Sequence, residues 1–173
     1  MSAQRVDNAQ VFVDGVDVGN ITGGVTVTLD RELTELNSDK FGSTPTDFAK
    51  LGDMYEFEVN MSDITIANLK RIIPDGILMP TDNDEEDATG IGFGSVAGGL
   101  QSENAVEVII HPRTLDVSNT AHDWVMYKAV VEASLSDEIS PDAQRIWTVT
   151  FRAIPDESKP EGRQLGHYGV LTS

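Results

Sequence analysis

The chain has 173 residues, 39% of them hydrophobic, and contains no cysteine. This size suits a single domain over residues 1–173, and no apolar run is long enough to cross a bilayer, so we expect no membrane partner. The 29 acidic residues against 12 basic ones give a formal net charge of −17. Such a charge repels phosphate backbones and disfavours tight binding to nucleic acid, although simple solubility is an alternative explanation for it.

The first ten residues are polar and lack both the basic start and the apolar stretch of a secretory signal. We therefore expect synthesis in a cytoplasm, which agrees with the absence of cysteine, and an N-terminal arm over residues 1–10. Asp14-Gly15 then separates two short β-branched runs, a pattern that predicts a two-residue hairpin turn.

A second turn is expected at Gly23-Gly24, before a strand in which apolar and polar residues alternate. Alternation with period two predicts that one face of this strand is buried and the other meets solvent or a wet cavity. The expected buried face carries Val25, Val27 and Leu29. The expected polar face carries Thr26, Thr28 and Asp30.

The pattern stops between residues 39 and 53, where glycine, proline and polar residues predict a long loop. Loops of this length are functional or disordered in compact domains, and apolar residues inside one favour a function. The residues singled out here are Phe41, Gly42, Pro45, Phe48, Leu51 and Gly52. We expect the loop to be flexible in the free subunit and to order against a neighbour; the alternative is a loop folded back on its own subunit.

The remaining elements indicate a core that is mostly β. Alternation predicts strands over residues 55–61, 105–110, 124–135 and 146–154, with Trp124, Trp147 and Phe151 in the core. Asp63 is the expected N-cap of a helix over residues 64–73 that Pro74 ends. Residues 75–104 are expected to be irregular. The C-terminal arm, residues 155–173, ends in apolar residues that suggest docking on another surface.

No motif in the chain predicts catalysis. The acidic tract over residues 82–87 begins like a calcium loop but lacks the glycine and the closing glutamate that such a loop needs. Residues 92–97 match a dinucleotide fingerprint without the preceding strand. His111, His122 and His167 lack metal-ligand spacing and are expected on the surface. We therefore expect no enzyme activity, no metal and no cofactor.

Three segments taken in order carry a resemblance: Val11-Phe12-Val13-Asp14-Gly15 with residues 18–25, Ser38 to Pro45 with Leu51-Gly52-Asp53, and Asp63 to Leu69 leading to Ile73-Pro74. Over about residues 11–76 the chain resembles the tail tube, or major tail, proteins of tailed bacteriophages. The family has no match for residues 81–99, and its longer members carry an additional immunoglobulin-like domain that we do not expect within residues 1–173.

The resemblance implies an antiparallel twisted β-sandwich or rolled barrel, tail-tube-like, with one flanking α-helix and a long extended loop. Six copies would close into rings that stack into a tube in the virion tail, after synthesis in the cytoplasm of the host bacterium. Residues 39–53 would reach the adjacent ring, and other tail proteins would meet the tube ends. DNA would pass through an acidic lumen without specific binding.

The alternation of strand residues places Thr26, Thr28, Asp30 and Glu132 on the polar faces expected to line that lumen. Two other functions stay open from the sequence. The first is a tail terminator or a tube-like component of a contractile injection system, which would share the fold without indefinite stacking. The second is a monomeric β-sandwich that binds a cation or a sugar through residues 81–99.

Overall fold

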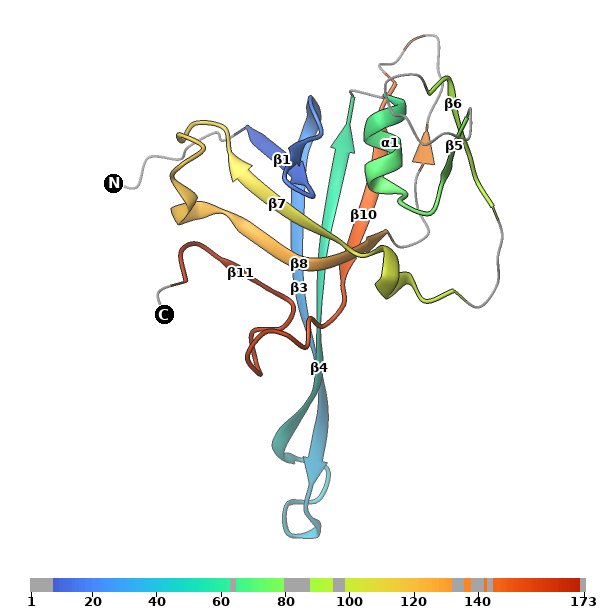
Figure 1. Cartoon of the computed structure of the whole chain (residues 1–173). Helices are drawn as coiled ribbons and strands as arrows, with labels where there is room; N and C mark the ends of the chain where they lie inside the picture. Colours follow the sequence, from blue (N-terminus) through green and yellow to red (C-terminus); the bar gives the residue numbers. More distant parts are fainter. Residues whose placement is uncertain are drawn as a thin grey trace.

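The computed structural model describes residues 8–62, 65–79, 88–94, 99–131, 136–137, 142 and 145–171. Within these ranges the chain is mainly β, with a single α-helix, as the sequence predicts (Figure 1). The main antiparallel sheet has the order β2-β1-β7-β8-β10-β4-β3, with β11 beside β8 and β9 beside β10. Its strands are β1 Ala9–Val13, β2 Val16–Asp17, β3 Ile21–Asn37, β4 Pro45–Met61, β7 Val106–Pro112, β8 Trp124–Val131, β9 Ser136–Asp137, β10 Trp147–Ala153 and β11 Gly166–Tyr168.

The sheet rolls around one hydrophobic core. Strand β1 lies against β3, although β3 is at one end of the hydrogen-bonded order and β1 is next to the other end, so the sheet nearly closes on itself. Fully buried side chains from five strands fill the interior: Val11, Phe57, Val108, Met126 and Phe151. Trp147 is also buried, and Trp124 packs partly against the core. The expected rolled, antiparallel β fold is therefore confirmed.

The first hairpin forms at the predicted turn. Asp14 and Gly15 have φ angles of 51° and 76°, which suit a two-residue turn between antiparallel strands. The register pairs Val13 with Val16 and Phe12 with Asp17. A glycine at the second turn position adopts this positive φ without the steric cost that a side chain would add.

The turn predicted at Gly23-Gly24 is wrong. Both glycines have positive φ, 82° and 90°, but they lie inside β3, where the register with β4 shifts between Ile21 and Val25. They therefore form a bulge that lets the strand bend and continue. Strand β3 therefore begins at Ile21, four residues before Val25, where the alternation alone indicates its start.

Helix α1, Ile66–Ile72, lies against the sheet where the sequence predicts a helix (Figure 1). The cap is Thr65, whose hydroxyl accepts a hydrogen bond from the Asn68 amide at 3.1 Å; Asp63, the predicted cap, is outside the described residues. Leu69 and Ile72 are buried against the core. The helix ends before Pro74, as expected, because proline cannot continue the backbone hydrogen bonding.

The described parts of residues 75–104, namely 75–79, 88–94 and 99–104, are more regular than predicted. Strands β5, Ile77–Met79, and β6, Gly90–Gly92, pair in a second, two-stranded sheet, and 3-10 turn η2 spans Gln101–Asn104. Short local pairing of this kind leaves little periodicity in the sequence. The acidic tract over residues 82–87 lies outside the described residues. Two further 3-10 turns are η1, Asp39–Phe41, and η3, Thr120–His122.

Candidate assembly surfaces

The most prominent surface feature is a two-stranded arm that leaves the body of the subunit. Strands β3 and β4 stay paired from Val25 with Val59 to Asn37 with Pro45, whereas β10 accompanies β4 only as far as Glu56 (Figure 1). From residue 29 in β3 and residue 55 in β4, the ribbon has no third strand among the described residues. We call residues 29–55 the arm.

The long loop predicted over residues 39–53 is therefore wrong as a loop. Only residues 38–44 turn, around η1 and Gly42, which has a φ of 64°. From Pro45 the backbone runs as a strand through Gly52 and beyond. Proline and glycine usually interrupt strands, which is why Pro45 and Gly52 suggested a loop. The strand accommodates both, because proline is tolerated as the first residue of a strand and glycine is tolerated next to a bulge.

The register shows how the arm side chains divide between two faces. Val27 pairs with buried Phe57 and Leu29 with buried Tyr55, so the face that covers the core continues along the arm. By period two, and with partners opposite each other, this core-side face carries Leu33 and Phe48 farther out. The side chains are exposed at 60% for Leu29, 49% for Leu33 and 54% for Phe48.

Leu29 thus departs from the sequence prediction. Val25 and Val27 are partly buried and pack against the core, but Leu29 extends past the edge of the body and is exposed. Leu51, at the bulge opposite Glu32 and Leu33, and Phe41, at the tip, are exposed as well. The alternative in which the loop folds back with its phenylalanines as satellites of the core is wrong, since neither Phe41 nor Phe48 contributes to the core cluster.

An ionic cluster interrupts the apolar face at the base of the arm. Arg31 Nε donates to Asp53 Oδ1 at 2.9 Å, and Lys50 Nζ donates to the other carboxylate oxygen. The hydrogen bond from Lys50, and then that from Arg31, holds the pKa of Asp53 below its ordinary value. Exposed ion pairs of this kind contribute little stability, so they do not explain why the arm is a ribbon.

The opposite, outer face of the sheet is mostly polar, and on the arm it also carries the exposed apolar side chains of Met54, opposite Asp30, and Leu36. Thr26, Thr28 and Asp30 are exposed there, and the register places Glu58 opposite Thr26 and Glu56 opposite Thr28. These two glutamates are additional candidates for a lumen-facing surface. The alternation of polar and apolar residues over 55–61 already places Glu56 and Glu58 on a polar face. Only the pairing of β3 with β4 shows that this is the same face as that of Thr26 and Thr28. Glu132, the remaining predicted lumen residue, lies outside the described residues.

The outer face extends onto β10. Thr148 Oγ1 donates to Asn60 at 2.7 Å, and Arg152 pairs with Glu56 at 2.8 Å. The alternating partners of these residues, such as Val149, are buried in the core. Three adjacent strands therefore present a continuous hydrophilic face, which is suited to contact with water on one side of the sheet.

The C-terminal arm docks on its own subunit, at least through Gly169. Strand β11 pairs with β8, and the Tyr168 ring lies 4.6 Å from that of Trp124. The Gly169 amide donates to the Asp123 carbonyl at 2.8 Å. Val170 and Leu171 remain exposed. The predicted docking is thus observed for β11, and the surface on which it docks is strand β8 of the same chain.

The histidines are not all on the surface, contrary to expectation. His111 is 1% exposed; its Nδ1 lies 2.6 Å from Asp123 Oδ1 and its Nε2 lies 3.4 Å from the Leu115 carbonyl. The contacts of His111 with Asp123 and Leu115 hold the connection between β7 and β8 against the sheet. Burial lowers the pKa of His167, whose Nδ1 has no hydrogen-bond partner in the described part of the chain. No group of three or more His, Asp or Glu residues in that part is arranged to hold a metal ion.

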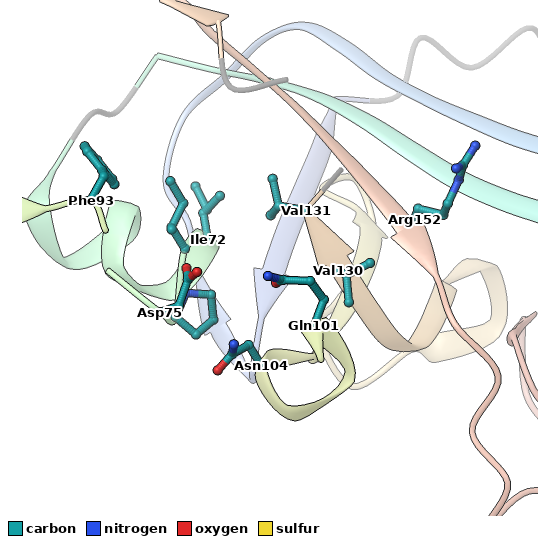
Figure 2. A pocket seen from close by; sticks show the side chains of 10 residues that line it. Ile72, Asp75, Phe93, Gln101, Asn104, Val130, Val131 and Arg152 are labelled. Atoms are coloured by element: carbon teal, nitrogen blue, oxygen red, sulfur yellow. The ribbon is translucent and has the colours of Figure 1, made fainter. Parts of the chain in front are cut away.

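A hollow of about 690 Å³ lies beside the C-terminal end of α1 (Figure 2). Its apolar lining includes Ile72, Val130 and Val131, with Phe93 on one side. Polar side chains from η2 and β10 complete the lining: Gln101, Asn104 and Arg152. At the hollow, Phe93 is exposed at 63%, Val130 and Val131 are partly buried, and Ile72 is fully buried.

Comparisons with known proteins add no further constraint. No protein-family model matches the chain, and no curated protein matches it. None of the helices in the described ranges has both the length and the apolar character needed to span a bilayer.

Proposed function

We propose that this protein is a tail tube protein of a tailed bacteriophage, whose copies close into hexameric rings that stack into the conduit for DNA ejection. The observation that carries the proposal is the arm, a two-stranded ribbon with apolar side chains on a face that its own subunit leaves uncovered. An isolated ribbon of two strands is marginally stable in water, and its unpaired edges attract other chains. A ribbon of this length therefore needs a partner.

A second copy of the chain is the simplest partner. The rolled sheet has open edges at β2 and β3, and closure of such edges through neighbours in a ring removes their tendency to pair without control. The resemblance of residues 11–76 to tail tube proteins points in the same direction. It covers the first hairpin, the arm tip and the approach to α1.

The polar outer face supports the role of a conduit. Thr26, Thr28 and Asp30, with Glu56 and Glu58 opposite, form a hydrophilic surface in a chain whose net charge is −17. On the inside of a tube, such a surface would repel the phosphate backbone and let DNA slide past. In this proposal the arm makes contacts between subunits, and the outer face lines the lumen.

The test is the state of the purified protein. Light scattering and negative-stain microscopy of concentrated protein in moderate salt should show rings or tubes. A strictly monomeric mass with no particles in the microscope would overturn the proposal. Rings that never lengthen into tubes would favour a tail terminator instead.

A further inference from the structure

Strand β11 is a short strand that returns to β8 after a loop of the chain. Strand β10 runs beside β8 as far as Ala153, and the Ile154 amide still donates to the Lys128 carbonyl at 2.9 Å. The chain then leaves β8, and the loop is closed by a hydrogen bond from the Asp156 amide to the Gln164 carbonyl before β11 begins. Because the loop separates the two strands, β11 can leave β8 while β10 stays paired.

Few contacts hold residues 165–169, which we call the strap, on β8. The Tyr127 amide donates to the Leu165 carbonyl at 3.3 Å, and Tyr168 and Gly169 make the contacts described above. Among the described residues, no strand pairs with the other edge of β11. A strand of three residues with one paired edge opens more readily than the central strands of a sheet.

The strap carries a polar atom that the docked position leaves unsatisfied. His167 Nδ1 is shielded from solvent and has no hydrogen-bond partner in the described ranges. The neutral imidazole can leave this nitrogen without a hydrogen, but the protonated imidazole carries a hydrogen on both nitrogens. The docked strap would then bury a charged N–H group without an acceptor, which is costly. Docking therefore favours the neutral form of His167.

The groups around His167 do not supply the missing acceptor. The Tyr127 ring of β8 lies 5.4 Å from the imidazole ring, measured between centroids. Burial is the largest influence and lowers the pKa of His167; Glu107 of β7 and Asp123 act in the opposite direction, and Lys159 of the loop adds to the lowering. The charges nearby therefore do not offset the burial.

His167 also lines a second hollow, of about 830 Å³, between the strap and the base of the arm. Seven other titratable side chains line this hollow: Arg31, Lys50, Asp53, Tyr55, Glu161, Arg163 and Tyr168. Three of them are cationic and two are anionic, so the hollow does not favour a further positive charge on the imidazole.

From these observations we propose that the strap is an acid-released element, in which protonation of His167 favours separation of residues 165–169 from β8. Release uncovers the edge of β8 at residues 124–126, the ring of Trp124 and one wall of the hollow at the arm base. The element acts within one subunit and does not depend on the formation of rings or tubes.

The size of the effect is set by the proton affinity of an exposed histidine, whose pKa is about 6.5. Each pH unit below that value favours the released form by up to about tenfold, because the proton binds the released form in preference to the docked one. Between pH 7.5 and pH 5.0, the released fraction should therefore rise by up to about 30-fold.

Hydrogen–deuterium exchange followed by mass spectrometry tests the release on the full chain. After correction for intrinsic exchange rates, peptides covering residues 124–127 and 165–169 should lose protection between pH 7.5 and pH 5.0, by up to about 30-fold. A peptide covering residues 10–18, in the first hairpin, should keep its protection. Unchanged protection of the strap and of β8 would overturn the proposal, and so would an equal loss in the hairpin, which would indicate unfolding of the whole subunit.

Two histidine variants identify the titrating group. His167→Gln should abolish the pH dependence, because glutamine stays neutral. His122→Gln is the matched control: His122 is exposed, its Nδ1 lies 2.7 Å from the Tyr168 hydroxyl, and its replacement should leave the pH dependence in place. An undiminished pH dependence in His167→Gln, or its loss in His122→Gln, would overturn the role of His167. The wild type and His122→Gln decide the question even if His167→Gln does not fold.

Discussion

Replacing Leu33 and Phe48 by serine should weaken assembly without unfolding the subunit. Full burial of a large apolar side chain contributes about 1.5–3 kcal/mol. Each of these side chains is about half exposed in the single subunit, so covering the remainder by a neighbour contributes about 0.8–1.5 kcal/mol per residue. The double variant should therefore lose about 1.5–3 kcal/mol per contact, which raises the concentration needed for assembly by roughly 10- to 150-fold.

The measurement is the protein concentration left in the supernatant after assemblies are sedimented, compared with the wild type. Val117→Ser is the control, because it removes an exposed apolar side chain, 61% exposed, away from the arm. Thermal unfolding of the L33S/F48S subunit should stay close to that of the wild type, since exposed substitutions change stability by about 0.5 kcal/mol or less. Unchanged sedimentation, or a subunit that unfolds, would refute the assignment of these residues to an intersubunit contact.

Three further predictions concern other parts of the molecule. Asp30→Lys with Glu58→Lys should leave assembly intact but make the assemblies retain duplex DNA at low salt in a filter-binding assay; DNA retention equal to the wild type would argue against a lumen-facing outer face. Gly166→Ala should lower the melting temperature in calorimetry, because the added Cβ would lie 2.0 Å from the Val125 carbonyl oxygen; overpacking of this kind costs about 1–3 kcal/mol. Burial lowers the pKa of His167 in the folded state, so its contribution to stability is present above about pH 6.5 and is lost as the pH falls through the folded-state pKa. The free energy of unfolding, measured with denaturant at pH 7.5 and at pH 5.5, should therefore fall less between the two pH values in His167→Gln than in the wild type.

Much of the fold could be predicted from local patterns. The hairpin at Asp14-Gly15 follows from the positive φ that these residues tolerate, and the alternation around Val149 and Phe151 correctly places β10 in the core. The helix over residues 66–72 follows from its apolar face and from Pro74. These features depend on neighbours in sequence, so one chain carries enough information to find them.

The candidate surfaces depended on pairing between distant residues, and there the sequence was less informative. Pro45 and Gly52 suggest a loop locally, but the backbone hydrogen bonds with β3 make the same residues part of a strand. Gly23-Gly24 likewise became a bulge, because β3 continues on both sides of it. The burial of His111 depends on Asp123, twelve residues away and without a motif that links them. The assignment of the arm and the outer face to a tube stays a prediction.

Because the arm lies outside the core, substitutions in the arm and substitutions in the body of the subunit are constrained for different reasons. Substitutions in the body alter the packing around Phe57 and Phe151 and are limited by folding. Substitutions beyond Tyr55 and Leu29 affect side chains that no part of the core depends on. If the arm contacts a neighbouring copy as proposed, its contacts can change while the fold keeps its stability, and the arm is then the place to graft a new binding specificity onto this scaffold.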